Sequence, residues 1–244
     1  MILEIFFGVN SRNPIEIEVI KEVKPDNIML SYYYWRNKSL YHLVEKIEYK
    51  PTIMLDSGGF SGFVDTEKYI DYIKEHLDII DHYLSPDYLP CGRDKSGEQT
   101  SHKYILFEDY GLPLPIPVYH YGEKEEILEC YIHGFGQNYI ALGNTVGTLH
   151  YSKVKDWVNK ITFKYNADFH LLGSTGKTIV NNCPLLKSCD STTWIQQAKR
   201  FGQPEHINNV KDRAIFQMEM IKKEYPVKYI QKLKYHHYKR TLFG

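Results

Sequence analysis

Residues Thr52–Asp56 read Thr-Ile-Met-Leu-Asp, and the loop sequence Ser57-Gly58-Gly59-Phe60 follows them directly. A short, continuous apolar run of this kind is typical of a strand buried on both faces of a parallel sheet. The next segment, Thr66–Ile80, repeats apolar residues at helical spacing, which predicts an amphipathic helix with one buried face. That face would consist of Tyr69, Ile70, Ile73, Leu77 and Ile80. The whole stretch therefore reads as one βα unit.

The same alternation recurs about every 25 to 30 residues, which is the rhythm of a parallel α/β fold. We expect strands at Ile2–Phe7, Asn27–Tyr33, Thr52–Asp56, His82–Asp87, Pro117–His120, Tyr139–Gly143, Phe169–Gly173 and Ser188–Ser191. We expect helices at Ile15–Val23, Ser39–Ile47, Thr66–Ile80, Gln99–Tyr110, Lys124–His133, Tyr151–Tyr165 and Asp212–Tyr225. Eight βα steps within about 200 residues predict a (β/α)8 TIM-type barrel.

Two features keep an open, doubly wound sheet as an alternative. Pro113, Pro115 and Pro117 alternate where the fifth strand should begin, and proline cannot donate to a strand ladder. The segment 174–187 is short for a crossover and shows no clear helical stripe. We assign residues 1–204 to the barrel and residues 205–244 to a basic C-terminal helical extension packed on the same domain.

The charge of the chain is unevenly distributed. The 244 residues include 30 basic and 30 acidic side chains, so the net charge is zero. Residues 222–240 nevertheless hold seven basic side chains and one acidic side chain, a pattern that suits contact with nucleic-acid phosphates. The residues expected to make this contact include Lys232, Lys234, Lys239 and Arg240. A solvated helix face is the alternative explanation.

Several classes of protein are disfavoured by composition. No apolar run approaches the roughly 18 residues of a membrane span, and the N-terminus lacks the basic start and apolar stretch of a signal peptide. The four cysteines form no Cys-x-x-Cys pair, so neither a zinc module nor a secreted disulfide framework is indicated. We expect a cytoplasmic protein, in the host cell if a phage encodes it, that contacts no membrane.

Acidic side chains close three of the expected strands, namely Asp56, Asp87 and Asp190. In a (β/α)8 barrel the carboxyl ends of the strands form the active-site face, so these groups would converge there. Each could instead cap the loop or helix that follows. Gly58 and Gly59 allow close approach of the backbone to a ligand, so the loop after Asp56 could hold a flat heterocycle. A plain tight turn is the competing explanation.

Other motifs are weaker. Gly173–Thr178 ends like a phosphate-binding P-loop, but too few residues separate Gly173 from the Gly-Lys pair. A backbone phosphate of a nucleic acid bound near Lys177 would suit a loop at this place in a barrel. Neither Gly-x-Ser-x-Gly nor His-Glu-x-x-His occurs. We interpret His170, which lies between apolar neighbours, as a satisfied core histidine rather than a base.

Asp56–Phe60 resembles the signature of the tRNA-guanine transglycosylase superfamily, whose fold is a (β/α)8 barrel. Tyr139–Gly147 is similar to the glycine-rich base-recognition strand of that family. His170–Gly173 resembles the next strand end, and Ser188–Trp194 resembles the nucleophile strand. The likeness runs in the same order along about residues 25 to 200.

The chain departs from the tRNA enzymes of that superfamily at several points. It lacks their Cys-x-Cys-x-x-Cys…His zinc subdomain, and Ser61 stands where they have Gln. Ser191–Trp194 follows the nucleophile position, where they have a Cys and a Pro-Thr-Arg run. These departures make the chain more similar to the phage and bacterial branch that places 7-deazaguanines in DNA (the DpdA group).

The resemblance implies an exchange of guanine in DNA for a 7-deazaguanine through two displacements at C1′. Asp190 would be the nucleophile that forms a covalent ester, and Asp56 would act as general acid and base on the purine. Asp87 would accept hydrogen bonds from the N1 and N2 edge of the base. The other expected substrate-binding residues are Ser57, Gly58, Gly59, Phe60, Gly143, Asn144, Leu172, Gly173 and Trp194.

The resemblance implies no metal or other cofactor, because the incoming base supplies the second nucleophile. The expected partners are DNA and a free 7-deazaguanine base, 7-cyano-7-deazaguanine or a close relative. Three alternatives stay open: the same chemistry on tRNA, a non-catalytic barrel that binds nucleic acid or a partner subunit, and an unrelated barrel glycosidase that uses two of the carboxylates.

Overall fold

The computed structural model describes residues 3–10, 13–86, 98–143, 145, 150–173 and 177–223. Its eight strands run parallel to their neighbours in the order β4-β3-β2-β1-β8-β7-β6-β5. The strands are β1 (Glu4–Val9), β2 (Asn27–Ser31), β3 (Thr52–Asp56), β4 (His82–Tyr83), β5 (Val118–His120), β6 (Tyr139–Gly143), β7 (Asp168–Leu171) and β8 (Ser188–Ser191).

The two ends of this strand order meet. A parallel bridge joins Leu84, just after β4, to Ile116, just before β5. The backbone N–H of Ser85 donates to the Ile116 carbonyl over 2.8 Å, and that of Ile116 donates to the Tyr83 carbonyl over 2.9 Å. The sheet is therefore closed, as the predicted barrel requires, and the alternative of an open sheet is wrong.

The register gives the geometry of closure. When the register is followed from the pair Asp190–Phe6 around all eight strands, with each offset continued beyond the paired residues, it returns to sequence position 182, eight residues before Asp190. Eight strands with a shear of eight define the TIM barrel, so the predicted (β/α)8 fold is confirmed. A shear of eight over eight strands is an offset of about one residue from each strand to the next. This offset determines which side chains lie at the same height along the barrel axis.

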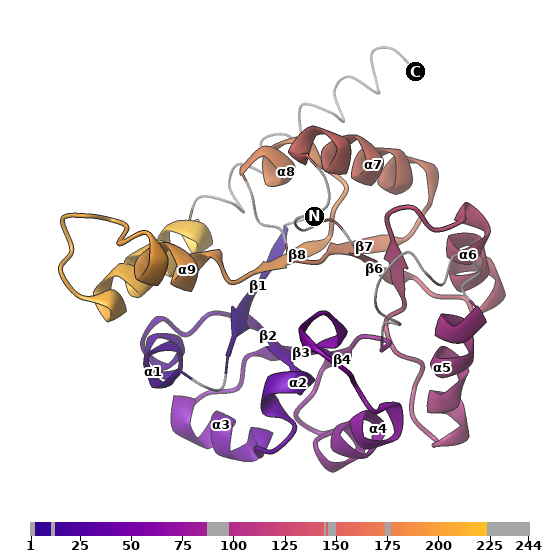
Figure 1. The fold of residues 1–244 in the computed structure, drawn as a ribbon, viewed down its shortest axis with the longest axis horizontal. Coiled ribbons are helices and arrows are strands. Elements are labelled where there is room, and N and C mark those ends of the chain that lie inside the picture. The colour runs from indigo at the N-terminus through magenta and orange to yellow at the C-terminus, as the bar shows by residue number, and fades with distance from the viewer. Residues whose placement is uncertain are drawn as a thin grey trace.

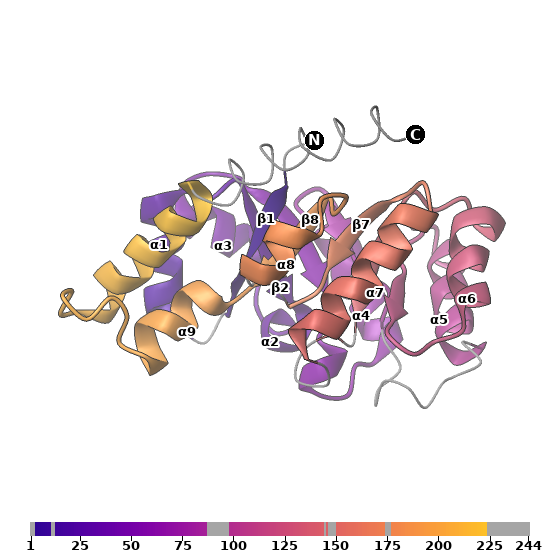
Figure 2. The same cartoon turned by 90° about the horizontal axis from the view of Figure 1, so that it is seen from above.

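A helix follows each strand and covers the barrel. These helices are α1 (Pro14–Val23), α3 (Leu40–Ile47), α4 (Thr66–Glu75), α5 (Glu98–Asp109), α6 (Glu125–Glu129), α7 (Tyr151–Lys164), α8 (Lys177–Asn182) and α9 (Thr193–Arg200). Shorter turns are α2 (Tyr32–Trp35), η1 (Gly59–Ser61) and the π-helical η2 (Cys130–Gly134). Figure 1 shows the helices as a ring around the strands. In Figure 2, β1 begins near the N-terminus at the top and α2, which follows β2, lies lower, so the carboxyl ends of the strands face downward in that view.

Capping residues set where helices begin. The Asn13 side chain accepts a hydrogen bond from the Ile15 N–H, and a proline occupies the first position of α1. Asp65 caps α4 by accepting from the Lys68 N–H over 3.3 Å. The predicted helix Thr66–Ile80 is too long, because α4 ends at Glu75 and leaves Leu77 42% exposed.

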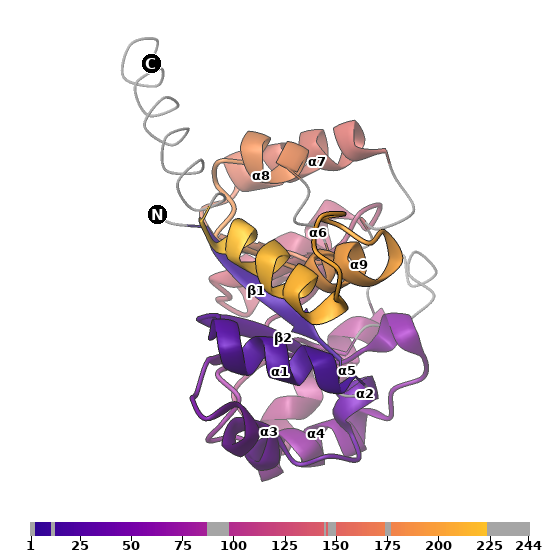
Figure 3. The ribbon, with the colours of Figure 1, turned by 90° about the vertical axis from the view of Figure 1, so that its left-hand side faces the viewer.

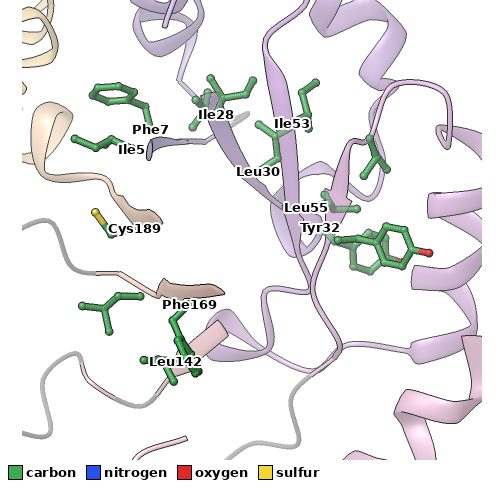
Figure 4. Packing of buried hydrophobic residues seen from close by; sticks show 14 of the residues in the cluster. Ile5, Phe7, Ile28, Leu30, Tyr32, Ile53, Leu55, Leu142, Phe169 and Cys189 are labelled. Atoms are coloured by element: carbon green, nitrogen blue, oxygen red, sulfur yellow. The ribbon is translucent and has the colours of Figure 1, made fainter. Parts of the chain in front are cut away.

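Two shells of apolar side chains hold the fold together. The larger lies between the sheet and the helices, and side chains that point outward from the strands fill it. They include Ile5, Phe7, Ile28, Leu30, Ile53, Leu55, Leu142, Phe169 and Cys189 (Figure 4). The smaller shell fills the barrel interior, and its members point inward from alternating positions. They are Phe6, Met29, Met54, Leu84, Ile116, Val118 and Ala141.

The register sorts the interior side chains into layers, as alternate strands of a TIM barrel do. Even-numbered strands supply the lowest layer, which consists of Asn27, His82, Tyr139 and Ser188. Odd-numbered strands supply the layer above that one, which consists of Phe6, Met54, Ile116 and His170. Even-numbered strands supply the layer above it, which consists of Met29, Leu84, Ala141 and Asp190. The layer nearest the mouth consists of Gly8, Asp56, Val118 and Leu172. Polar side chains thus fill the lowest layer, and in the layers above it they come from β7, β8 and β3.

Several predicted boundaries need correction. The strand expected at Asn27–Tyr33 ends at Ser31, and the aromatic run Tyr32–Trp35 forms α2, where the Trp35 indole N–H donates to the Val9 carbonyl over 3.2 Å. β1 begins two residues later than expected, and β7 begins one residue earlier than expected. The helices α8 and α9 were not predicted.

The chain after the barrel strands returns to its first helix. Residues 210–223 form a helix, and Figure 3 shows it beside α1. Lys211 pairs with Glu22 over 2.9 Å, and the Lys222 ammonium donates to the Val23 carbonyl over 2.9 Å. Among the described residues, no helix has the length and apolar character needed to cross a membrane.

Candidate functional site

Asp190 lies inside the barrel rather than at its surface. It is 9% exposed and shares its layer with Met29, Leu84 and Ala141. Its Oδ1 accepts a hydrogen bond from the Gly173 backbone N–H over 2.7 Å and lies 3.2 Å from Nε2 of His170. A carboxylate in an apolar surrounding is costly unless it is hydrogen-bonded, and these two nitrogens provide the bonds. The carboxyl group is therefore held in one orientation at the floor of the barrel mouth.

The neighbouring side chain on β8 points the other way. Cys189 belongs to the outer shell, and it is fully buried there. Burial raises the pKa of its thiol, so the thiolate that a nucleophile needs is disfavoured. Of these two adjacent side chains on β8, Asp190 is the one that faces the interior.

Polar side chains continue below Asp190. Nδ1 of His170 lies 2.6 Å from Oγ of Ser188, and that oxygen lies 2.5 Å from the Tyr139 hydroxyl. His170 and Ser188 are both fully buried. Burial raises the pKa of Tyr139, which keeps its hydroxyl protonated. His170 is thus a satisfied core histidine, as interpreted from the sequence, and it is also a direct partner of Asp190.

Asp56 lies one layer nearer the mouth, at the end of β3. By alternation along the strand it faces the same side as Met54, which belongs to the interior shell. Its Oδ2 accepts a hydrogen bond from the Gly58 backbone N–H over 3.0 Å. Ser57 is almost fully buried, and its hydroxyl accepts from the Gly59 N–H over 3.4 Å. The Asp56 loop is therefore a tight turn whose carboxylate is retained at the mouth.

Gly58 is the position in this turn that excludes a side chain. Its φ is +80°, and a Cβ there would lie 2.3 Å from Oγ of Ser31 and 2.6 Å from Cβ of Tyr33. We expect Gly58→Ala to lower the free energy of unfolding by about 2 to 4 kcal/mol, since strain and overlap add. Denaturant unfolding measures this loss. Gly111→Ala is the control, because φ is +72° there but no atom lies within 4 Å, so only the backbone cost of about 1 to 2 kcal/mol is expected. Equal losses in the two variants would contradict the close approach.

A second buried polar pair lies at the end of β5. Nδ1 of His120 is 3.0 Å from Oε1 of Glu123, and the His120 backbone N–H donates to Oε2 over 2.7 Å. The imidazole lies against β6, because a Cβ on Gly143 would be 2.7 Å from its Cδ2. The predicted site residue Gly143 is therefore glycine because His120 occupies the adjoining space.

Leu172 and Gly173 follow β7 at the same edge of the barrel. Leu172 is half-buried and packs against the interior shell. Its carbonyl accepts from the Thr145 hydroxyl over 3.2 Å, which joins the ends of β6 and β7. The Gly173 amide is one of the two groups that hold Asp190. The structure thus joins Gly173 directly to Asp190 and places Leu172 beside them at the end of β7.

Trp194 does not fit its predicted role as a substrate-stacking residue. It is fully buried in the outer shell, and its indole N–H donates to the Gly8 carbonyl over 3.2 Å. The residue therefore anchors α9 to β1, and neither ring face is available to a base.

Some predicted residues lie outside the described part of the chain. They are Asp87, Asn144, Lys232, Lys234, Lys239 and Arg240. The structure describes the backbone of Phe60 in η1 and of Lys177 in α8, but not their side chains. Their predicted roles stay predictions.

Sequence reasoning missed several polar residues of the interior. Ser188, Tyr139 and the pair His120–Glu123 received no role. The spacing His-x-x-Glu at a strand end was a local signal for that pair, whereas the Ser188 and Tyr139 contacts depend on register between distant strands. Among the described residues, no group of three or more His, Cys, Asp or Glu is placed to hold a metal ion.

The chain matches no protein-family model and no curated protein. Its fold is similar to that of solved structures. The YdjI aldolase from Escherichia coli K12 has a TM-score of 0.53 at 13% identity, over 96% of this chain and 90% of that one. The tryptophan synthase alpha chain from Legionella pneumophila subsp. pneumophila has a TM-score of 0.58 at 9% identity, over 95% and 92%. At these identities the likeness shows the shared barrel alone.

Proposed function

We propose that this chain is a transglycosylase that exchanges guanine in DNA for a free 7-deazaguanine base. The observation that carries the proposal is the placement of Asp190, an acid buried at the floor of the barrel mouth with one oxygen held by two nitrogen atoms. An interior layer of a TIM barrel is ordinarily filled by branched apolar side chains, so an acid kept there calls for a function. A carboxylate fixed in this way at the mouth of the barrel suits attack on a sugar carbon.

The proposed reaction is a double displacement. In the first step an oxygen of Asp190 attacks C1′, the C1′–N9 bond breaks, and the purine leaves with that electron pair and a proton from Asp56. In the second step Asp56 takes the N9 proton of the incoming base, N9 attacks C1′, and the ester bond to Asp190 breaks. Two inversions restore the original configuration, as in retaining glycosidases. The protein is regenerated without an external oxidant, reductant or nucleotide triphosphate.

The rim of the mouth offers groups that suit a single nucleic-acid strand. Phe63, on the loop between β3 and α4, is 85% exposed. The Arg36 guanidinium lies 4.6 Å from the ring centroid of Tyr33, which follows β2. Aromatic rings that stack on bases and cations that contact phosphates are the usual means of holding a single strand. A target base must leave its stack to reach a carboxylate at the depth of Asp190.

DNA is preferred to tRNA as the polymer on sequence grounds. The chain has no match to the zinc subdomain of the tRNA enzymes, and Ser191–Trp194 departs from their nucleophile strand. The test is incorporation of labelled 7-cyano-7-deazaguanine by the purified chain into matched DNA and tRNA substrates, read by nucleoside mass spectrometry. Incorporation into DNA supports the proposal, and incorporation into tRNA alone would move the activity to the other polymer. No exchange with either, although the polymer binds, would favour a non-catalytic barrel.

The basic tail carries a separate prediction about binding. We expect the combined replacement of Lys232, Lys234 and Lys239 by Gln to weaken DNA binding and to reduce the slope of log K against log salt by about 2 to 3. Fluorescence anisotropy at several salt concentrations measures the slope. Replacement of Lys21, Lys46 and Lys74 by Gln is the control. It removes the same number of positive charges, but from the last turns of the barrel helices α1, α3 and α4 instead of from the tail. An unchanged slope in the tail variant would leave the tail as a solvated face.

A further inference from the structure

We infer that His170 is a positioning residue whose proton on Nε2 points at Asp190, and that Ser188 and Tyr139 set this tautomer. The inference rests on a continuous line of short contacts. It runs from the Tyr139 hydroxyl to Ser188 Oγ over 2.5 Å, from Ser188 Oγ to His170 Nδ1 over 2.6 Å, and from His170 Nε2 to Asp190 Oδ1 over 3.2 Å. These residues come from three adjacent strands, β6, β7 and β8.

Counting protons decides the direction of the hydrogen bonds. The Tyr139 hydroxyl keeps its proton, because burial raises its pKa. It can therefore donate to Ser188; the Ser188 hydroxyl then donates to Nδ1 of His170, and Nδ1 is then the unprotonated nitrogen of a neutral ring. The remaining ring proton then sits on Nε2 and is donated to the Asp190 carboxylate. In this arrangement each contact of the line has one donor and one acceptor.

The opposite arrangement is disfavoured by the same geometry. A proton on Nδ1 would be donated to Ser188, and the lone pair of Nε2 would face a carboxylate oxygen at 3.2 Å. Two acceptors in contact within a buried site repel each other without solvent to screen them. His170 has no exposed surface, and the Phe6 ring lies edge-on to it with centroids 5.7 Å apart. The ring therefore has little room for another orientation.

The arrangement distinguishes the two oxygens of Asp190. Both nitrogen contacts, from Gly173 and from His170, reach Oδ1. Among the described residues no such contact reaches Oδ2, so Oδ2 is the oxygen available for attack. For the exchange reaction, which is itself the proposal made above, His170 would act through Asp190 by holding the carboxylate plane and not by touching the substrate.

The tautomer can be tested without any activity. Nitrogen-15 NMR of the full chain labelled in histidine reports which ring nitrogen carries the proton. We expect the His170 signal, assigned by its loss in His170→Gln, to show a neutral ring protonated on Nε2. Ser188→Ala should shift this signal toward a mixture of tautomers, because Nδ1 loses its donor. A ring protonated on Nδ1, or on both nitrogens, in the unmodified chain would overturn the inference.

Kinetics then separate positioning from support of the fold. We expect His170→Leu to lower kcat by about 100-fold with little change in KM, because the nucleophile is misplaced while the binding surface remains. His170→Gln should recover most of kcat, since an amide N–H near the place of Nε2 can still donate to Oδ1. Equal loss in the Leu and Gln variants, with both folded by circular dichroism, would contradict positioning by that donor.

A matched control tests whether removing any buried tyrosine hydroxyl lowers kcat. Tyr139→Phe removes the first donor of the line and is expected to lower kcat about tenfold. Tyr72→Phe removes a comparable bond in the outer shell, from its hydroxyl to the Lys38 carbonyl over 2.9 Å, and should leave kcat unchanged. Equal kcat values for these two variants would contradict the role of Tyr139. If the unmodified chain exchanges no base, the function proposal fails while the NMR result still decides the inference.

Discussion

Asp190→Asn is expected to abolish base exchange, with a loss of at least about 10⁴-fold, while the barrel keeps its stability. The amide has the shape of the carboxylate, and its carbonyl oxygen can still accept from the Gly173 N–H and from Nε2 of His170. An amide oxygen does not form the ester with C1′ that a double displacement requires. A loss of base exchange in Asp190→Asn would therefore reflect removal of the nucleophile and not damage to the fold. The measurement is incorporation of labelled 7-deazaguanine into DNA, with thermal unfolding as the check on stability.

The covalent intermediate gives a second readout for the same variant. With DNA present and no free base to complete the exchange, the unmodified chain should retain DNA through denaturing electrophoresis, and Asp190→Asn should not. Asp168→Asn is the control, because Asp168 begins the neighbouring strand at the opposite end of the barrel and pairs with Lys187 over 2.9 Å. A denaturation-resistant adduct in Asp190→Asn would remove this residue as the nucleophile. Loss of the adduct in Asp168→Asn as well would point to a general defect.

The fold was predictable where local pattern and tertiary environment agree. Thr52–Asp56, Tyr139–Gly143 and Ser188–Ser191 are strands with the expected bounds. The first two are short apolar runs that end in an acid or a glycine, whereas Ser188–Ser191 reads Ser-Cys-Asp-Ser and is mostly polar. Prediction from the local pattern failed where an apolar residue is buried by a contact with a segment distant in sequence. Tyr32 and Tyr33 read as a continuation of β2, yet the Trp35 indole donates to the Val9 carbonyl and Tyr32–Trp35 forms α2.

The candidate site, like the fold, could be predicted from the sequence only in part. Asp56 and Asp190 could be found from sequence because Asp56 ends β3 and Asp190 stands one residue before the end of β8, and the barrel sends the carboxyl ends of its strands to one face. The neighbours that hold Asp190 could not be found in this way. His170 and Ser188 lie opposite each other only once β7 and β8 are paired in register. The chain separates them by 18 residues, so no periodic pattern records the contact.

Trp194 shows the opposite error, in which chemical type suggested a function that burial excludes. A tryptophan close to a proposed nucleophile suits base stacking, but the position after β8 begins a helix that must pack against β1. The indole bond to the Gly8 carbonyl fills that need. Function therefore has to be read from groups that reach the mouth, and Asp56 is the acid of β3 that does so.

Asp56→Asn is expected to lower exchange by about 10²- to 10⁴-fold, the usual contribution of a general acid and base. The alternative interpretation of Asp56 is structural, because its Oδ2 accepts from the Gly58 N–H and shapes the turn. Asparagine keeps a carbonyl oxygen for that bond but cannot carry the transferred proton. The substitution therefore preserves the turn and removes the proposed chemistry. Asp65→Asn is the matched control, because Asp65 accepts from a backbone N–H in the cap of α4 and should leave exchange unchanged.

A substrate that needs no acid makes the test sharper. N7-methylguanine in DNA already carries a positive charge, so it can leave C1′ without receiving a proton. If Asp56 supplies that proton, Asp56→Asn should form the covalent adduct from N7-methylguanine DNA at nearly the rate of the unmodified chain, and from ordinary DNA far more slowly. If Asp56 only shapes the loop, the substitution should lower the rate of adduct formation by the same factor for the two substrates, because a distorted mouth would bind both poorly. Only a selective rescue agrees with an acid placed one layer above a buried nucleophile.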